Sequence, residues 1–184
     1  MNQLWQLWRG LLTDKQCDRL IDLSRQYEPI NATIGQDDKN KIDEGYRRST
    51  VRWVSNNKEI RDLMWYHAEE ANRNAFGFDI SLIRDIQFTE YNADVNAKYD
   101  WHIDTFWGNS KPFDRKISVV VQLSDPNDYE GGEFELDRAY EQPVGFEERG
   151  SIFVFPSFLH HRVTPVTKGT RYSLVSWIEG KNFK

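Results

Sequence analysis

This sequence has little cysteine, no excess of basic residues and no long apolar run. Only one of its 184 residues is a cysteine, Cys17, so no disulfide can form within the chain and nothing indicates an oxidising compartment. Asp and Glu outnumber Lys and Arg by 29 to 24, which argues against a protein that coats nucleic acid, because such proteins neutralise phosphates with basic side chains. The mean hydropathy is -0.74, and no apolar run approaches the ~20 residues that span a membrane. The first ten residues also lack the pattern of a secretory signal, so we expect a cytoplasmic protein without nucleic-acid or membrane partners.

Aromatic residues, in contrast, are abundant. They make up 14% of the chain, within a hydrophobic fraction of 39%, which is typical of a folded domain with a full core. At roughly 100–200 residues per domain, the length predicts a single domain over 1–184. We expect residues 1–80 to form a helical support with a loop region, and residues 81–180 to form the core that carries the chemistry.

Two helices are predicted in the first part of the chain. The first begins after Thr13, which forms a capping box with Gln16, and its apolar stripe runs to about Gln26. The second begins near Asn56, with Glu59 as its capping partner, and Gly77 is a plausible stop. Between them, residues 31–50 are polar, and we interpret them as a long loop or a pair of short edge strands.

The pattern changes to strands after residue 80. Six short β-rich runs follow one another, separated by Gly, Pro, Asn and Asp. Helices followed by many strands predict an α+β, mainly β fold, in which an antiparallel double sheet or jelly roll carries the helices on one face. The segment 128–132, with its two glycines, is interpreted as a hairpin turn.

A candidate metal site lies at His102 and Asp104. On an extended strand these two side chains share a face, and they need a third ligand from another strand. The alternation of residues favours His161 over His160, because His161 is in phase with the apolar Val163. Two histidines and one carboxylate form a facial triad that suits non-haem Fe(II) and leaves three coordination positions open. The alternative is that these are unrelated polar residues at strand ends. Asp100 is a second carboxylate on the same face, and it could replace Asp104.

A candidate anion site lies at Arg171, ten residues after His161 and at the predicted start of a strand over 170–178. A buried arginine is costly unless an anion meets it, and a guanidinium binds a carboxylate with two parallel hydrogen bonds. A dicarboxylate that chelates the metal with one end and meets Arg171 with the other would join the two sites. Ser173 lies on the same face of that strand.

The residues His102-X-Asp104, the distal His161 and the run Gly169-X-Arg171-X-Ser173 together resemble a known family. They are similar to the Fe(II)- and 2-oxoglutarate-dependent dioxygenases, and above all to the prolyl-4-hydroxylase-like branch with its bacterial and phage PKHD-type hydroxylases. The segments around 122–133 and 155–166 resemble that branch as well. The resemblance covers residues ~85–180, about half of the chain.

The resemblance implies a double-stranded β-helix, or jelly roll, that couples hydroxylation of a substrate to decarboxylation of 2-oxoglutarate by O2. In such an enzyme His102, Asp104 and His161 would hold Fe(2+), with the family order favouring Asp104 over Asp100. Arg171 would meet the distal carboxylate of 2-oxoglutarate, and Ser173 would assist. The resemblance also brings in ascorbate as a candidate cofactor.

Two further positions bear on the cosubstrate pocket. Tyr91 matches a tyrosine that lines the cosubstrate pocket of relatives, and a plain core tyrosine is the alternative. Many animal relatives have a tyrosine on the strand before the Gly-Gly segment, at the position that we align with Val121 of this chain.

The substrate favoured by the resemblance is a peptidyl proline, with a free amino acid or another small molecule as the alternative. Trp107 and Arg47 are candidate substrate-binding residues that would shield the reaction, although packing or solvated-face roles would also suit them. The nucleic-acid-demethylating branch carries a second arginine where this chain has Trp177, which argues against that activity. A jelly-roll binding module or a cupin that uses no 2-oxoglutarate is the remaining alternative, and Arg171 argues against it.

Overall fold

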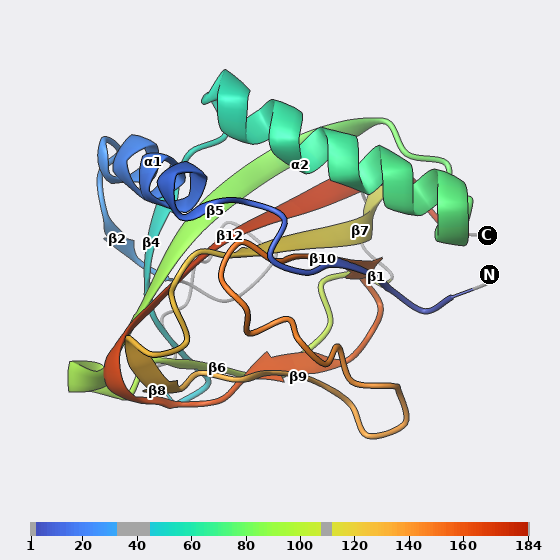
Figure 1. Ribbon diagram of the computed structural model, residues 1–184. Coiled ribbons are helices and arrows are strands. Elements are labelled where there is room, and N and C mark those ends of the chain that lie inside the picture. Colours follow the sequence, from blue (N-terminus) through green and yellow to red (C-terminus); the bar gives the residue numbers. More distant parts are fainter. Residues whose placement is uncertain (1–2, 33–44, 108–111, 184) are drawn as a thin grey trace.

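Two antiparallel sheets face each other in a computed structural model, which describes residues 3–32, 45–107 and 112–183 (Figure 1). In chain order the elements are β1 (Gln6–Trp8), α1 (Asp14–Arg25), β2 (Ile30–Asn31), β3 (Arg47–Arg48), β4 (Thr50–Trp53), α2 (Lys58–Ala71), the π-helical turn η1 (Asn72–Phe76), β5 (Leu82–Asn92), the 3₁₀ turn η2 (Ala93–Val95), β6 (Lys98–His102), β7 (Phe113–Gln122), β8 (Tyr129–Gly131), β9 (Phe134–Leu136), β10 (Ile152–Pro156), β11 (His161–Val163) and β12 (Val166–Lys181).

Within these residues the larger sheet has the strand order β1-β10-β7-β12-β5-β4-β2, with β8 attached to β12, and the smaller sheet has the order β3-β6-β11-β9. Both helices lie on the outer side of the larger sheet, above it in Figure 1. The predicted α+β, mainly β fold with helices on one face of a jelly roll is therefore confirmed. No helix in the described part of the chain is both long and apolar enough to cross a membrane.

The two helices begin where the sequence indicates. Thr13 and Gln16 form the capping box of α1, in which each side chain bonds the backbone N–H of the other. The cap of α2 is Asn57, whose side-chain oxygen accepts from the backbone N–H of Ile60. Glu59 was therefore the wrong capping partner, and its carboxylate instead binds Arg19 of α1 with two hydrogen bonds of 2.7 Å.

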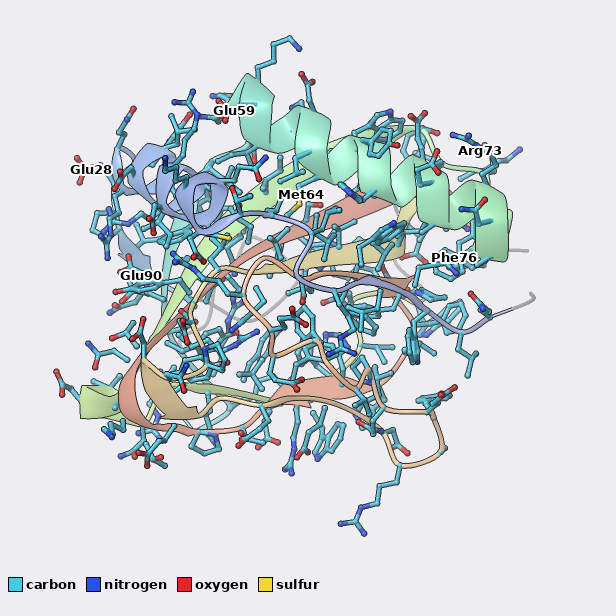
Figure 2. The ribbon with its side chains drawn as sticks, in the orientation of Figure 1. Glu28, Glu59, Met64, Arg73, Phe76 and Glu90 are labelled. Atoms are coloured by element: carbon cyan, nitrogen blue, oxygen red, sulfur yellow. The ribbon has the colours of Figure 1, made fainter. Side chains whose placement is uncertain are left out.

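The second helix ends, after the π-helical turn, at Gly77 with φ 68°, a left-handed conformation that glycine adopts without strain. Its apolar face, including Met64, points down onto the larger sheet (Figure 2). Of the segment 31–50, the structure shows the short strands β2 and β3, while residues 33–44 lie outside the described part.

Side chains of β7 alternate between two cores. Val119 and Val121 pack beneath the helices, whereas Val120 packs between the two sheets. Because the period of a strand is two, Ser118 and Gln122 share the face of Val120 and also point between the sheets. This inner face of the larger sheet is one wall of the candidate site.

The segment 128–132 does not form the hairpin that the glycines suggested. The strand β8, which lies within this segment, pairs with β12 of the larger sheet, and the strand after the segment, β9, pairs with β11 of the smaller sheet. Gly131 (φ 73°) and Gly132 (φ 66°) make this crossing between sheets, and a Cβ on Gly131 would lie 2.1 Å from the carbonyl oxygen of Pro165. Tertiary packing, and not the turn itself, therefore selects the strand partners.

Candidate metal centre

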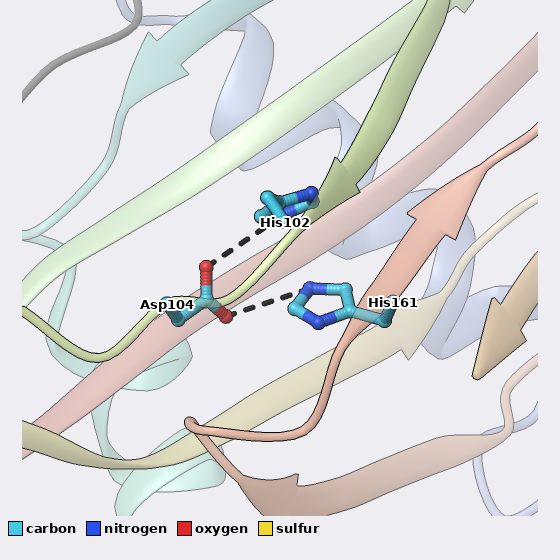
Figure 3. A group of neighbouring side chains, drawn as sticks. All are labelled: His102, Asp104 and His161. Carbon is cyan, nitrogen blue, oxygen red and sulfur yellow. Dashed lines mark ion pairs between the residues drawn. The ribbon is translucent and has the colours of Figure 1, made fainter. Parts of the chain in front are cut away.

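Three side chains from two neighbouring strands meet between the sheets (Figure 3). His102 ends β6, Asp104 follows two residues later, and His161 begins β11, where its Cα is the register partner of His102. One potential ligand atom of each residue lies within 4.8 Å of those of the other two. At relative exposures of 9%, 5% and 5%, the three groups are held away from bulk water.

Hydrogen bonds orient both imidazoles toward Asp104. The Nδ1 atom of His102 lies 2.7 Å from the carbonyl oxygen of Asp100, and that of His161 lies 2.8 Å from the carbonyl oxygen of Leu159. A carbonyl oxygen only accepts, so each Nδ1 carries the hydrogen and each Nε2 keeps its lone pair.

The two lone pairs face the two oxygens of the carboxylate. The Nε2 atom of His102 is 3.7 Å from Oδ1 of Asp104, and that of His161 is 3.6 Å from Oδ2. The dashed lines of Figure 3 mark these two contacts. The tautomers therefore present three acceptor atoms toward one point.

The local environment favours the ionisation states that a divalent metal requires. Burial, together with the adjacent His161, lowers the pKa of His102 to about 3, and burial also lowers the pKa of His161. Burial on its own raises the pKa of Asp104, but His161, His102, Arg115 and a hydrogen bond from Ser118 bring it below its ordinary value. Two neutral imidazoles beside an ionised carboxylate are ready to bind a cation without first losing protons.

The three residues line a narrow cavity of about 30 Å³ that also contains Arg171. The side chain of Arg171 is 2% exposed, and its guanidinium lies 5.7 Å from the ring centroid of Tyr91. Among the described residues no carboxylate forms an ion pair with Arg171. A buried cation without an internal counter-ion is unfavourable unless an external anion meets it. The cavity therefore combines three potential metal ligands with a buried guanidinium that pairs with no described carboxylate.

Further cavity residues come from the same strand faces. Ser173 and Tyr91 line it beside Arg171, as the sequence suggested, and Arg47 lines it from β3 with its guanidinium 4.3 Å above the ring of Tyr99. Trp107 is not among the residues that line the cavity; its side chain is 57% exposed and packs against Phe183.

The neighbouring alternatives lie elsewhere. The side chain of His160 is 44% exposed and pairs with Asp137 at 3.3 Å, outside the cluster. That of Asp100 is 41% exposed and lies 3.6 Å from the ammonium of Lys98. His67 is buried in α2, with its Nδ1 2.9 Å from the carbonyl oxygen of Leu63. The structure thus brings together His161 and Asp104, not His160 and Asp100.

Sequence reasoning missed several residues of the site. Tyr99 stacks on His102 with ring centroids 3.5 Å apart, and Trp177 and Phe134 complete an aromatic wall. Alternation could have found Trp177, which shares a strand face with Arg171 and Ser173. Tyr99 lies on β6 and Phe134 lies on β9, directly after the glycine crossing, and alternation along β12 says nothing about either residue.

Val121, which stands where many relatives have a tyrosine, does not face the cavity. Its side chain is fully buried under the helices. The residue that accompanies Arg171 is Gln122, in a larger cleft of about 960 Å³ that Phe134 and Arg171 also line. The amide of Gln122 donates to the hydroxyl of Tyr129 at 2.8 Å. A shift of one residue exchanges the two faces of a strand, so Val121 points to the helices and Gln122 to the space between the sheets.

The chain is similar in sequence to known proteins. Residues 86–179 match the family model described as the 2OG-Fe(II) oxygenase superfamily. A PKHD-type hydroxylase of Synechococcus sp. (strain CC9311) is 30% identical over 176 residues, which is 92% of this chain and 75% of the relative. A PKHD-type hydroxylase of Gloeothece citriformis is 36% identical over 97 residues, but these are 53% of this chain and only 43% of the relative.

Solved structures show the same fold at low sequence identity. A prolyl-4-hydroxylase of Pseudomonas putida matches with a TM-score of 0.72 and 20% identity, over 98% of this chain and 94% of that one. The viral collagen prolyl hydroxylase of Paramecium Bursaria Chlorella virus-1, in its 2OG complex, matches with a TM-score of 0.70 and 19% identity, over 97% of both chains.

Proposed function

The chain belongs to the 2OG-Fe(II) oxygenase superfamily, and from this premise we propose that it hydroxylates a C–H bond with Fe(2+), 2-oxoglutarate and O2. One observation carries the proposal: two neutral histidines and a carboxylate converge in a cavity that also contains a buried arginine, which pairs with no carboxylate in the described part of the chain. A cupin or a simple jelly-roll binding module has no use for that arginine.

The donor set fits Fe(II). His102 and His161 would each bind through Nε2, and Asp104 would bind through a carboxylate oxygen, which leaves open positions on one face of the ion. The carbonyl oxygens of Asp100 and Leu159 hold both rings in the required tautomer. When bound, the iron with its cosubstrate supplies the oxidising chemistry, in which 2-oxoglutarate yields succinate and CO2 and the substrate gains a hydroxyl group.

The residues present also suit a dicarboxylate, because Arg171 lines both the narrow cavity at the metal ligands and the larger cleft of about 960 Å³. Arg171 would bind the C5 carboxylate with its planar fork, while the other end of the five-carbon chain turns toward the metal ligands. Ser173, buried on the same strand face, would assist as a second donor. Tyr91, the register partner of Arg171 on β5, would close one side of the pocket.

The chain's own contribution to the reaction is to orient the reactants and to exclude water. The rings of Tyr99, Trp177 and Phe134 line the cavity around the metal ligands. Such walls keep a reactive site dry and restrict how a substrate approaches. Neutral imidazoles and an ionised Asp104 need no proton transfer before the site is ready.

A peptidyl proline is the substrate that we favour. Solved neighbours of this fold are named as prolyl hydroxylases, and the aromatic wall of Tyr99 and Trp177 would accommodate an apolar pyrrolidine ring. Arg47 would bind polar groups of the same substrate from the cavity wall.

Substrate-dependent succinate release tests the proposal. The purified protein, with Fe(II), 2-oxoglutarate, O2 and ascorbate as reductant, is offered proline-containing peptides and, separately, free amino acids. We expect release with the peptides and none from a His161→Ala control. Turnover of free amino acids but not of peptides would show that the substrate is a small molecule and not a peptidyl proline. If the metal-loaded wild-type protein does not bind 2-oxoglutarate, the oxygenase assignment itself is refuted.

A further inference from the structure

A chain of two buried hydroxyl groups ends on the carboxylate of Asp104. The hydroxyl of Ser118 donates to Oδ2 of Asp104 at 2.6 Å, and the hydroxyls of Ser118 and Ser157 lie 2.9 Å apart. Both serines have a relative exposure of 0%. A contact this short between a hydroxyl and a buried carboxylate is a charge-assisted hydrogen bond, of the stronger class in proteins.

The donors and acceptors in this chain have only one consistent order. An ionised carboxylate has no hydrogen to give, so Ser118 must donate its single hydrogen to Asp104. The contact between the two serines then requires Ser157 to donate to Ser118. The hydrogen bonds therefore run from Ser157 through Ser118 to Asp104, and each polarises the next.

The same chain joins the two sheets. Ser118 lies on β7 of the larger sheet, whereas Asp104 follows β6 of the smaller one. The backbone carbonyl of Ser157 accepts from the N–H groups of Asp104 and Thr105 at 2.8 and 3.1 Å, and the N–H of Ser157 donates to the carbonyl of Lys116 at 3.0 Å. The segment that leads to His161 is thus tied to the backbone and to the side chain of the metal-site carboxylate.

This arrangement separates the two oxygens of Asp104. Oδ2 is held by Ser118, and Oδ1 accepts no hydrogen bond from the described side chains. We propose that Ser118, supported by Ser157, is a positioning residue that fixes the Asp104 carboxylate so that Oδ1 is presented to the metal. The pair thereby sets the metal affinity of the site. This inference rests on the metal site of the proposed function and goes beyond its ligands.

The test is a direct titration of the metal-free protein with Mn(II). The electron paramagnetic resonance signal of free Mn(II) reports the unbound metal, so no turnover is needed. Partners that orient a ligand typically contribute 10–100-fold to metal affinity. We expect Ser118→Ala to weaken Mn(II) binding by about 10–100-fold, and Ser118→Thr, which keeps the hydroxyl, to recover most of it.

Ser176→Ala is the matched control. Ser176 is also fully buried, on β12 next to β7, but its hydroxyl has no hydrogen-bond partner in the described part of the chain. We expect unchanged Mn(II) affinity in this variant. The urea midpoint of each metal-free variant shows whether a change in affinity is only a loss of folded protein.

Ser157→Ala separates positioning from general packing. Because Ser157 acts through Ser118, the double variant Ser118→Ala/Ser157→Ala should bind Mn(II) no more weakly than Ser118→Ala alone. Additive losses would overturn the proposed order of hydrogen bonds. Wild-type affinity in folded Ser118→Ala would overturn the positioning role while leaving the metal site intact. A wild-type protein that binds no Mn(II) would instead refute the metal site of the proposed function.

Discussion

Replacing Arg171 by methionine should have opposite consequences for ligand binding and for folding. Arg171 is 2% exposed and has no carboxylate partner among the described residues, so the variant removes a buried charge without leaving a counter-ion behind. Removing one partner of a buried charge pair costs ~3–5 kcal/mol. If the 2-oxoglutarate carboxylate is that partner, Arg171→Met should raise the dissociation constant by roughly two to four powers of ten.

Two measurements check this prediction. Anaerobic calorimetry of 2-oxoglutarate with the Mn(II)-loaded protein gives the dissociation constants. Urea unfolding at a fixed ligand concentration gives the linked stability. At 100 times the wild-type dissociation constant the ligand should stabilise the wild type by about 2.7 kcal/mol, and a variant bound 100-fold more weakly by only about 0.4 kcal/mol. Arg171→Lys should fall between them, since the charge remains without the planar fork.

The folding of the metal-free variant supplies the sharper discrimination. Without ligand, the urea midpoint of Arg171→Met should equal or exceed that of the wild type, because the substitution breaks no ion pair that the described residues form. Arg84→Met is the control: it removes the half-exposed arginine that pairs with the buried Glu179, so it should lower the urea midpoint but leave 2-oxoglutarate affinity unchanged. Wild-type affinity in Arg171→Met, or a loss of several kcal/mol in its ligand-free stability, would refute the reasoning.

Three further predictions concern the metal ligands, the crossing between sheets and pH. His161→Ala should abolish tight metal binding as measured by metal content after dialysis, whereas His160→Ala should retain it; the opposite result would mean that the other histidine is the ligand. Gly132→Ala should raise the dissociation constant of 2-oxoglutarate about tenfold or more, because its Cβ, in a left-handed backbone (φ 66°), would lie 2.7 Å from Cγ2 of Val166 and 3.2 Å from Cδ of Arg171; unchanged calorimetric affinity would contradict it. The stability of the metal-free protein should fall as the pH drops below about 6.5 and toward about 3, because the lowered pKa of His102 lets only the unfolded state take up the proton there. The slope should approach about 1.4 kcal/mol per pH unit per histidine in urea titrations, and a flat profile would exclude it.

Sequence reasoning succeeded where one short stretch of chain decides the outcome. The capping box of Thr13 and Gln16, the stop at Gly77 and the mainly β texture after residue 80 all follow from neighbours within one helical turn or one strand. The alternation that places His102 and Asp104 on one face, and prefers His161 to His160, is equally local. Residues two apart on a strand share a face whatever the rest of the chain does.

Tertiary structure alone decided which strands become neighbours, and with them the remainder of the site. The glycine segment at 131–132 looks like a hairpin, yet its flanking strands pair with β12 and β11, because burial of both sheet faces outweighs a local turn preference. Ser118 reaches Asp104 only because the two sheets close on each other. The partner of a buried hydroxyl or guanidinium is set by packing between segments far apart in the chain. Spacing along the sequence therefore indicated the candidate metal ligands, and the packing of the two sheets determined which residues hold them in place.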